Sequence, residues 1–310
     1  MTFHNPYKRM DVFQCRHGAH ADFRGRVSPY HVLKEKACFP DGCLSFVWHC
    51  MRLTKGEPCI HGYRTAGKSC KGCTWFMDEK IHFQPECMLG GDAYARFLEE
   101  LDAFDGWVES LEYKRVSVAG RIRSVKPHYQ RVLYDRETHT RLRGYLLAVK
   151  PAYIGMDCFQ DTLYIRITEG QMKAQGFVPK MKLECTGEIR LDRGRVVLHR
   201  PGRFEIVKKG WGKPWTRDRA LVSIKTAKSL PVQPDRCLVC PWGVLVDTED
   251  RRESGHPFRR RLFCLKGVEN PPECYVDALR RAKRRKGKTP PKRADRRASD
   301  REESGIRKAD

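Results

Sequence analysis

The sequence predicts a mainly β fold, in which a central set of strands carries a packing helix and is flanked by two small Cys-rich metal-binding regions and a disordered basic tail. Three observations support this fold class. Residues 113–208 alternate apolar and polar side chains, the cysteines cluster on both sides of that stretch, and the last residues are mostly charged. The predicted regions are 1–90 (Cys-rich), 91–112 (packing helix), 113–208 (strands), 209–234 (linker), 235–276 (Cys-rich) and 277–310 (tail).

The first region, residues 1–90, contains eight of the 14 cysteines and few long apolar periodic segments. We expect such a region to bury little core of its own and to need metal to fold.

Residues 92–111 have the apolar spacing of one amphipathic helix. We expect Asp92 to cap it and Gly106 to end its regular part. The predicted buried face consists of Tyr94, Phe97, Leu98, Leu101 and Phe104.

Period-two patterns predict the strands. They cover 116–122, 143–154, 163–167, 181–191 and 195–198, with a short helical segment at 168–174 and an Asp192-Arg193-Gly194 turn. If Ile122 faces inward, Arg121 and Arg123 face outward; by the same logic Tyr164 and Arg166 face outward from the third strand.

The order of three strands, a short helix and a hairpin resembles the OB fold, and the run 182–189 resembles the fourth strand of OB domains of the tRNA-synthetase and helicase type. The resemblance covers residues 113–208 and departs from the family in a long first connection, 126–140. It implies a five-stranded barrel that binds single-stranded nucleic acid on its second and third strands, with base stacking on Tyr164. The implied contact residues are Arg121, Arg123, Tyr129, Arg131, Tyr134, Tyr164 and Arg166.

Residues 209–234 contain several Gly and Pro residues and predict an irregular linker, while 277–310 are predicted to be disordered. The formal net charge of +23 suits a polyanion, and the tail from residue 280 alone has 14 basic and five acidic residues. There is no apolar run of membrane-spanning length and no N-terminal signal-like segment, so we expect a cytoplasmic protein with no membrane partner.

The spacing of the cysteines predicts metal ligands. One set is Cys237, Cys240, Cys264 and Cys274, and another is Cys59, Cys70, Cys73 and Cys87. Four cysteines suit tetrahedral zinc or a [4Fe–4S] cluster. Each set has a single CxxC pair and so resembles the clusters of DNA-repair helicases, certain uracil-DNA glycosylases and certain nucleases, which favours iron–sulfur slightly over zinc. A third site, with histidines nearby, is formed from Cys15, Cys38, Cys43 and Cys50.

Residues 62–69 match the spacing of a phosphate-binding P-loop, but no buried strand precedes them, so nucleotide hydrolysis is not predicted. We expect a metal-containing nucleic-acid-binding protein. Two alternatives stay open: a zinc or iron–sulfur enzyme that processes nucleic acid (a nuclease, a glycosylase or an RNA-modifying enzyme), and a redox or protein-interaction factor.

Overall fold

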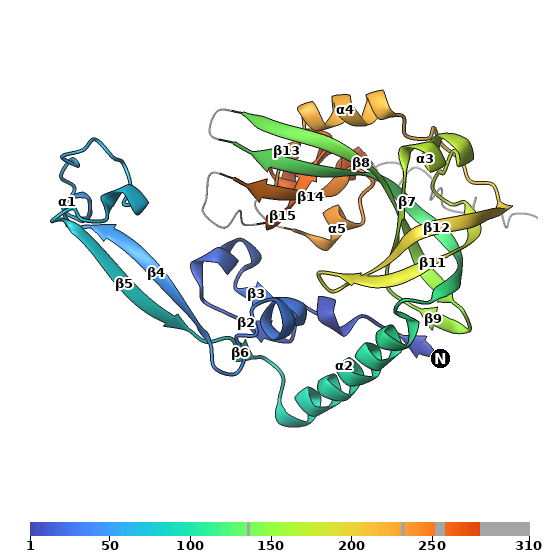
Figure 1. Ribbon diagram of the computed structural model, residues 1–310, viewed down its shortest axis with the longest axis horizontal. Helices are drawn as coiled ribbons and strands as arrows, with labels where there is room; N and C mark the ends of the chain where they lie inside the picture. Colours follow the sequence, from blue (N-terminus) through green and yellow to red (C-terminus); the bar gives the residue numbers. More distant parts are fainter. Residues whose placement is uncertain (135–136, 231–232, 252–257, 280–310) are drawn as a thin grey trace, which may run out of the picture. The chain divides into compact units, whose positions relative to one another are not determined.

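The computed structural model describes residues 1–134, 137–230, 233–251 and 258–279 (Figure 1). The chain forms two compact units, Met1–Glu269 and Asn270–Asp310. Within the described residues, ten strands of the first unit form one sheet, so the predicted mainly β class is confirmed.

Five strands of this sheet pair with one another in the predicted order. They are β7 (Arg115–Leu133), β8 (Thr138–Ile154), β10 (Leu163–Ile167), β11 (Lys182–Asp192) and β12 (Arg195–Lys208). β7 is antiparallel to both β8 and β11, β8 is antiparallel to β10, β10 is parallel to β12, and β12 is antiparallel to β11. Each of the five therefore pairs with two others. Between β10 and β11 lies α3 (Glu169–Gln175), which begins with a capping box on Thr168.

Side chains in these strands alternate as the sequence predicts. Ile122 is fully buried, whereas Arg121 and Arg123 are exposed. On β10, Leu163, Ile165 and Ile167 are buried and the side chains between them are partly exposed.

The predicted loop 126–140 is wrong, because most of it belongs to β7 and β8, which stay paired as far as Leu133 and Thr138. The predicted separation of region 235–276 is also wrong. Its strand β14 (Gly243–Asp250) runs parallel to β7, and β15 (Phe258–Cys264) pairs with β14. The physical reason is apolar burial: Val244 and Val246 join the main hydrophobic core, which a separate small unit would lack.

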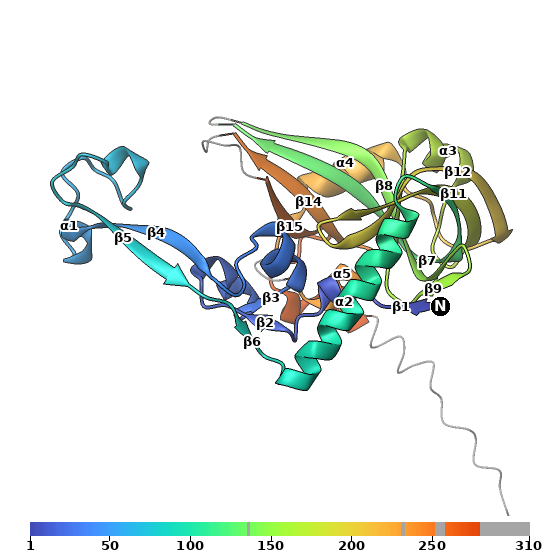
Figure 2. The ribbon, with the colours of Figure 1, turned by 60° about the horizontal axis from the view of Figure 1, so that its bottom comes forward.

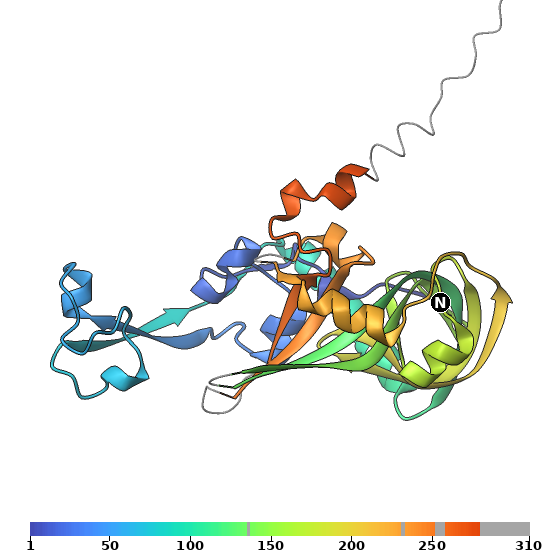
Figure 3. The same ribbon diagram turned by 90° about the horizontal axis from the view of Figure 1, so that it is seen from above.

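The predicted linker 209–234 contains α4 (Arg217–Lys225) and β13 (Lys228–Ser229), which pairs with β15. Thr216 caps α4, and the buried Ala220 and Ile224 anchor it on the core. Figures 1 and 3 show α4 beside the far halves of β7 and β8.

The packing helix is α2 (Gly91–Leu111), which lies near β11 (Figure 2). Phe97, Leu101 and Phe104 are buried as predicted, but Leu98 is exposed, and Trp107 and Val108 extend the buried face. The helix starts slightly earlier than expected, after Gly90. Asp92 therefore lies in the first turn, where its negative charge interacts favourably with the helix dipole. It also continues through Gly106, since the buried residues beyond it hold the last turn on the core.

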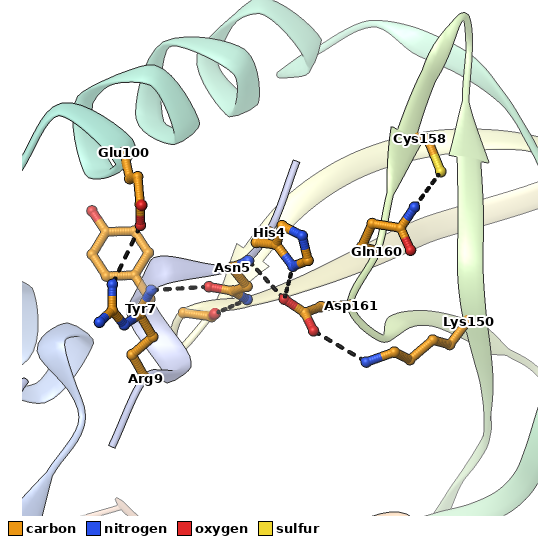
Figure 4. A network of polar contacts seen from close by, with 10 residues as sticks. His4, Asn5, Tyr7, Arg9, Glu100, Lys150, Cys158, Gln160 and Asp161 are labelled. Carbon is orange, nitrogen blue, oxygen red and sulfur yellow. Dashed lines mark hydrogen bonds and ion pairs between the residues drawn. The ribbon is translucent and has the colours of Figure 1, made fainter. Parts of the chain in front are cut away.

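The N-terminal segment contributes more core than predicted. Tyr7, Val12 and Phe13 are buried in the same cluster as α2. β1 (Thr2–Phe3) pairs with β9 (Asp157–Phe159), and the Asn5 backbone N–H donates to Asp161 Oδ2 at 2.8 Å (Figure 4). Asp161 also accepts from Lys150 Nζ at 3.2 Å. These bonds fix the start of the chain on the main sheet.

Two small sheets complete the region before α2. One consists of β2 (Phe13–Gln14), β3 (Arg26–Val27) and β6 (Glu86–Cys87), and the other is the hairpin of β4 (Cys43–Cys50) and β5 (Phe76–Phe83). The short α1 (Met51–Thr54) follows β4 at the far end of that hairpin. The predicted disorder of 277–310 is wrong for residues 277–279, which belong to a short helical segment, and residues 280–310 lie outside the described part of the chain. None of the described helices is both long and apolar enough to cross a membrane.

Candidate nucleic-acid interface

A polar pocket with a volume of about 320 Å³ opens where six strands meet. Its lining residues are His128, Gln130, Arg143, Arg166, Asp192, Arg193, Asp247 and Arg260. They come from β7, β8, β10, β11, β14, β15 and the turn between β11 and β12. Four arginines face two aspartates, and we call this site the arginine pocket.

Strand register brings several of these side chains together. Asp247 of β14 stands opposite Gln130 of β7 on one side and opposite Arg260 of β15 on the other. Arg166 points away from the core because its neighbours Ile165 and Ile167 point into it. The lining residues therefore share one surface although they lie up to 132 positions apart in the sequence (His128 to Arg260).

Arg260 forms ion pairs with both aspartates. The Nε atom of Arg260 lies 2.6 Å from Asp247 Oδ1, and its Nη2 atom lies 2.9 Å from Asp192 Oδ2. Burial opposes the charge on Arg260, but the hydrogen bonds and charges of the two aspartates outweigh burial and raise its pKa. Burial likewise opposes the charge on Asp247, yet the nearby His128 and the hydrogen bonds of Arg260 hold its pKa well below the usual range.

The other three arginines keep their charge available. No ion pair within 4.0 Å is found for Arg143, Arg166 or Arg193 among the residues that the structure describes. The pocket therefore has a surplus of positive charge after the aspartates are paired. This surplus suits an anionic group, because arginine binds phosphate and carboxylate in a planar, two-pronged geometry.

Two buried nitrogen atoms in the pocket lining, Arg166 Nε and His128 Nδ1, find no hydrogen-bond partner within the described part of the chain. His128 is only 7% exposed, and its Nε2 lies 3.9 Å from Asp247 Oδ2. A buried polar group without a partner costs about 1–3 kcal/mol. A bound oxygen atom would satisfy the Arg166 donor.

Lys8 lies beside the arginine pocket, and its pKa is lowered there. Burial, reinforced by the charges of Arg195 and Arg260, lowers its pKa to about 7. Its Nζ donates a short hydrogen bond to the Arg193 carbonyl oxygen. Burial also lowers the pKa of Arg195, which lines a smaller adjoining cavity with Tyr164. Besides burial, the charges of Arg195 and Arg260 lower the pKa of Lys8, so positive charge is concentrated on this side of the pocket.

Of the residues predicted to contact nucleic acid, Arg166 lines the arginine pocket, and Tyr164 lines the adjoining smaller cavity together with Arg166. Arg121 and Arg123 lie elsewhere on β7: Arg121 is paired with Lys182 of β11, and Arg123 Nε donates to the Lys150 carbonyl oxygen. They are exposed but do not line the pocket.

The three residues of the predicted loop behave differently from expectation, because that loop is a strand pair. Tyr129 is fully buried, and its hydroxyl donates to the Ala220 carbonyl oxygen at 2.7 Å, so it cannot stack on a base. Arg131 packs over the Phe263 ring at 4.7 Å. Tyr134 is 37% exposed at the hairpin end, beside Arg251.

Seven of the eight pocket residues were not predicted as contacts from the sequence: His128, Gln130, Arg143, Asp192, Arg193, Asp247 and Arg260. Two features of the sequence could have pointed to basic residues beside strands: the turn Asp192-Arg193-Gly194 and the basic run 259–261. Neither reveals that β14 and β15 continue the main sheet.

The upstream cysteines are grouped differently from the prediction. The eight paired residues of β4 and β5 put Cys43 opposite Phe83 and Cys50 opposite Phe76. At roughly 3.3 Å per residue, the two ends of this ladder are about 23 Å apart. Cys87 follows β5 at one end and Cys73 precedes it at the other, so the predicted set of Cys59, Cys70, Cys73 and Cys87 does not meet.

The strand register places Cys50 and Cys87 at opposite ends of the β4–β5 hairpin. Cys50 lies at the hairpin end near Cys73, whose carbonyl oxygen accepts from the Phe76 N–H. Cys15 and Cys43 are neighbours of Cys38, whose pKa is raised by burial and by these two thiols. Cys87 pairs with Phe13, two residues before Cys15.

Cys237, Cys240 and Cys264 belong to the first unit, whereas Cys274 belongs to the second. Cys264 stands opposite Gly243, whose N–H donates to the Cys240 carbonyl oxygen, and it packs with Cys237 in a small apolar cluster. Across the described ranges, no group of three or more Cys, His, Asp or Glu side chains is arranged to hold a metal ion.

Comparison with known proteins gives no relative: no family model, curated protein or solved structure matches this chain.

Proposed function

We propose that this protein binds single-stranded nucleic acid, DNA or RNA, and that the arginine pocket holds a backbone phosphate. The observation that carries the proposal is the surplus charge of Arg143, Arg166 and Arg193 around a buried Arg166 donor for which the described residues offer no acceptor. A phosphate oxygen would accept from Arg166, and the neighbouring guanidinium groups would balance its charge.

We infer further that β7, β8, β10, α3, β11 and β12 constitute an OB-like barrel. The support is the order of the elements and the pairing of each of the five strands with two others. OB domains bind oligonucleotides on the second and third strands. Arg143 of β8, with Tyr164 and Arg166 of β10, corresponds to that face.

The charge of the whole chain favours the same class of ligand. A formal net charge of +23 attracts a polyanion, and release of counterions from the backbone supplies much of the affinity.

Fluorescence anisotropy with labelled oligo(dT) and oligo(U) tests the proposal. The strands are about 12 nucleotides long, within the roughly 4–16-nucleotide site of an OB domain. We expect the double variant Arg143→Ala, Arg166→Ala to weaken binding at least about tenfold. The slope of log affinity against log salt concentration should become shallower by about 0.7 for each phosphate that the variant no longer neutralises.

The matched control is Arg96→Ala, which removes an exposed arginine from α2. It should bind within about twofold of the wild-type protein, since its charge is remote from the pocket and screened by salt. If the double variant and the control bind equally well, the arginine pocket is not the nucleic-acid site.

We propose, in addition, that the cysteines bind zinc or a [4Fe–4S] cluster in regrouped sets. Cys50, Cys59, Cys70 and Cys73 all belong to the far end of the β4–β5 hairpin, where Cys50 and Cys70 are each 7% exposed. The Cys73 N–H donates to the Cys70 carbonyl oxygen, the tight turn of a CxxC pair. Four thiols fit either metal centre, and binding would draw them together around it.

A further inference from the structure

Three of the six tryptophans surround a second pocket, with a volume of about 220 Å³. Its lining residues are Val125, Phe177, Pro179, Lys180, Trp211, Gly212, Lys213, Trp215, Arg219, Pro241 and Trp242. They come from segments around β7, α3 and α4 and from the residues before β14. We call this site the tryptophan pocket.

Two of the tryptophans form a fixed floor. Trp215 is 9% exposed, and its Nε1 donates to the Val125 carbonyl oxygen at 3.0 Å. Trp242 meets it edge to face, with ring centroids 5.5 Å apart. These two rings are therefore explained by packing and hydrogen bonding within the fold.

Trp211 is different, because 68% of it is exposed. Its backbone is nevertheless held in place: its N–H donates to the Pro179 carbonyl oxygen at 3.3 Å. The residue before it, Gly210, lies so close to Pro179 that a Cβ there would sit 2.4 Å from the same oxygen. The fold thus presents a large aromatic ring to solvent on a tethered loop, and the ring contributes little to the core.

Cations surround these rings. Lys180 Nζ lies 4.0 Å from the Trp211 ring centroid, and the Arg219 guanidinium lies 4.5 Å from that of Trp215. Lys213 also lines the pocket, and none of its described lining residues is acidic. Lys180 covers one face of Trp211, so the exposed area lies on the other face and the ring edge.

We propose that the tryptophan pocket stacks one unpaired base of a bound single strand on the open face of Trp211, while Lys180 and Lys213 contact the adjoining phosphates. The inference rests on the proposed nucleic-acid binding and names a further contact for it. An aromatic face with cations at its rim matches a base flanked by phosphates. The pocket is smaller than the roughly 300–1,000 Å³ of sites for drug-sized ligands, which suits a single planar ring.

The stack requires a base face that pairing and stacking do not hide, so the pocket selects single strands. Base–aromatic stacks are tolerant of sequence because every base has a π-face. We therefore expect oligo(dT) and oligo(dA) to use the pocket alike, and duplex DNA not to use it.

The experiment compares Trp211→Ala with Trp75→Ala by oligo(dT) anisotropy and by quenching of intrinsic tryptophan fluorescence. Trp75 is a matched control, since it is 36% exposed and has Arg52 at 5.5 Å from its ring, but it does not line the tryptophan pocket. We expect Trp211→Ala to weaken oligo(dT) binding about five- to 100-fold and to remove most of the quenching. Trp211→Phe should recover part of the affinity, and an abasic strand of equal length should bind both proteins equally.

Other outcomes separate this inference from the proposed function. If Trp211→Ala binds oligo(dT) like wild type while the Arg143→Ala, Arg166→Ala variant binds weakly, the stacking inference is wrong and the arginine pocket stands. If the wild-type protein binds no nucleic acid, both fail. If an oligoglutamate peptide quenches the tryptophans and oligo(dT) does not, the pocket serves an acidic peptide and the inference is overturned.

Discussion

Replacing Arg260 by Leu tests the electrostatics of the arginine pocket. The Arg260 side chain is 13% exposed and bridges Asp247, at 21%, and Asp192, at 34%. Removing one partner of a largely buried ion pair leaves the other charge unpaired and costs about 3–5 kcal/mol. Because both aspartates keep some contact with water, we expect the lower end, about 3 kcal/mol of unfolding free energy at pH 7.

The destabilisation should depend on pH with a defined sign. In the wild-type protein the pKa of Asp247 is below its ordinary value of 3.8, so its ion pair stabilises the fold fully above that value. This contribution is lost only as the pH falls through the depressed folded pKa. Without Arg260, the buried carboxylate can be relieved by protonation, so the difference between variant and wild type should be smaller at about pH 3.5 than at pH 7.

Urea unfolding at the two pH values measures this difference. Arg217→Leu is the matched control, because Arg217 also pairs with a carboxylate, through Nη1 to both oxygens of Glu169 at 2.6 and 2.7 Å, but on the surface. We expect the control to lose much less stability, because an exposed ion pair is screened by water and salt. The reasoning is refuted if Arg260→Leu and Arg217→Leu cost the same, or if the cost of Arg260→Leu does not change with pH.

Three further predictions concern single residues. Lys8 has a folded pKa of about 7 against an ordinary value of 10.5, so the unfolded chain binds the extra proton between those values and stability rises with pH. Lys8→Met should remove a rise of at most about 1.4 kcal/mol per pH unit, and equal slopes in pH-dependent urea unfolding would contradict this. Tyr129→Phe leaves the buried Ala220 carbonyl oxygen without its donor and should cost about 1–2 kcal/mol in the same assay, with unchanged oligo(dT) affinity. Cys50→Ser should lower the zinc or iron content of purified protein in step with Cys73→Ser, and a normal metal content in Cys50→Ser would reject the regrouped set.

Local patterns in the sequence determined the local elements. The alternation of apolar and polar residues predicted the strands around Ile122 and Ile165 and the outward direction of Arg166. This works because successive side chains of a strand point to opposite faces, whatever strand it pairs with. Helical spacing likewise identified α2 and most of its buried face. These inferences need only the few residues on either side.

Spacing of the cysteines was a weaker guide, because a ligand set depends on distance in space. Cys87 is 14 positions from Cys73 and Cys50 is 23, yet the hairpin register brings Cys50 to the Cys73 end and takes Cys87 to the other. An eight-residue ladder lies between Cys73 and Cys87, whereas the chain after Cys50 turns back on itself. Sequence separation therefore grouped Cys87 with Cys73 although the hairpin register separates them.

The sequence by itself thus determined the mainly β class, the order of the strands and the excess of positive charge. Tertiary structure alone decided that β14 lies beside β7, and with it the positions of Asp247 and Arg260 in the arginine pocket. It also decided that Tyr129 is a core residue and that Trp211, from a predicted linker, stands exposed above a basic pocket. The physical reason is that strand partners far apart in the chain are chosen by the burial of whole apolar faces, here Val244 and Val246, and no local pattern records which face a strand will meet.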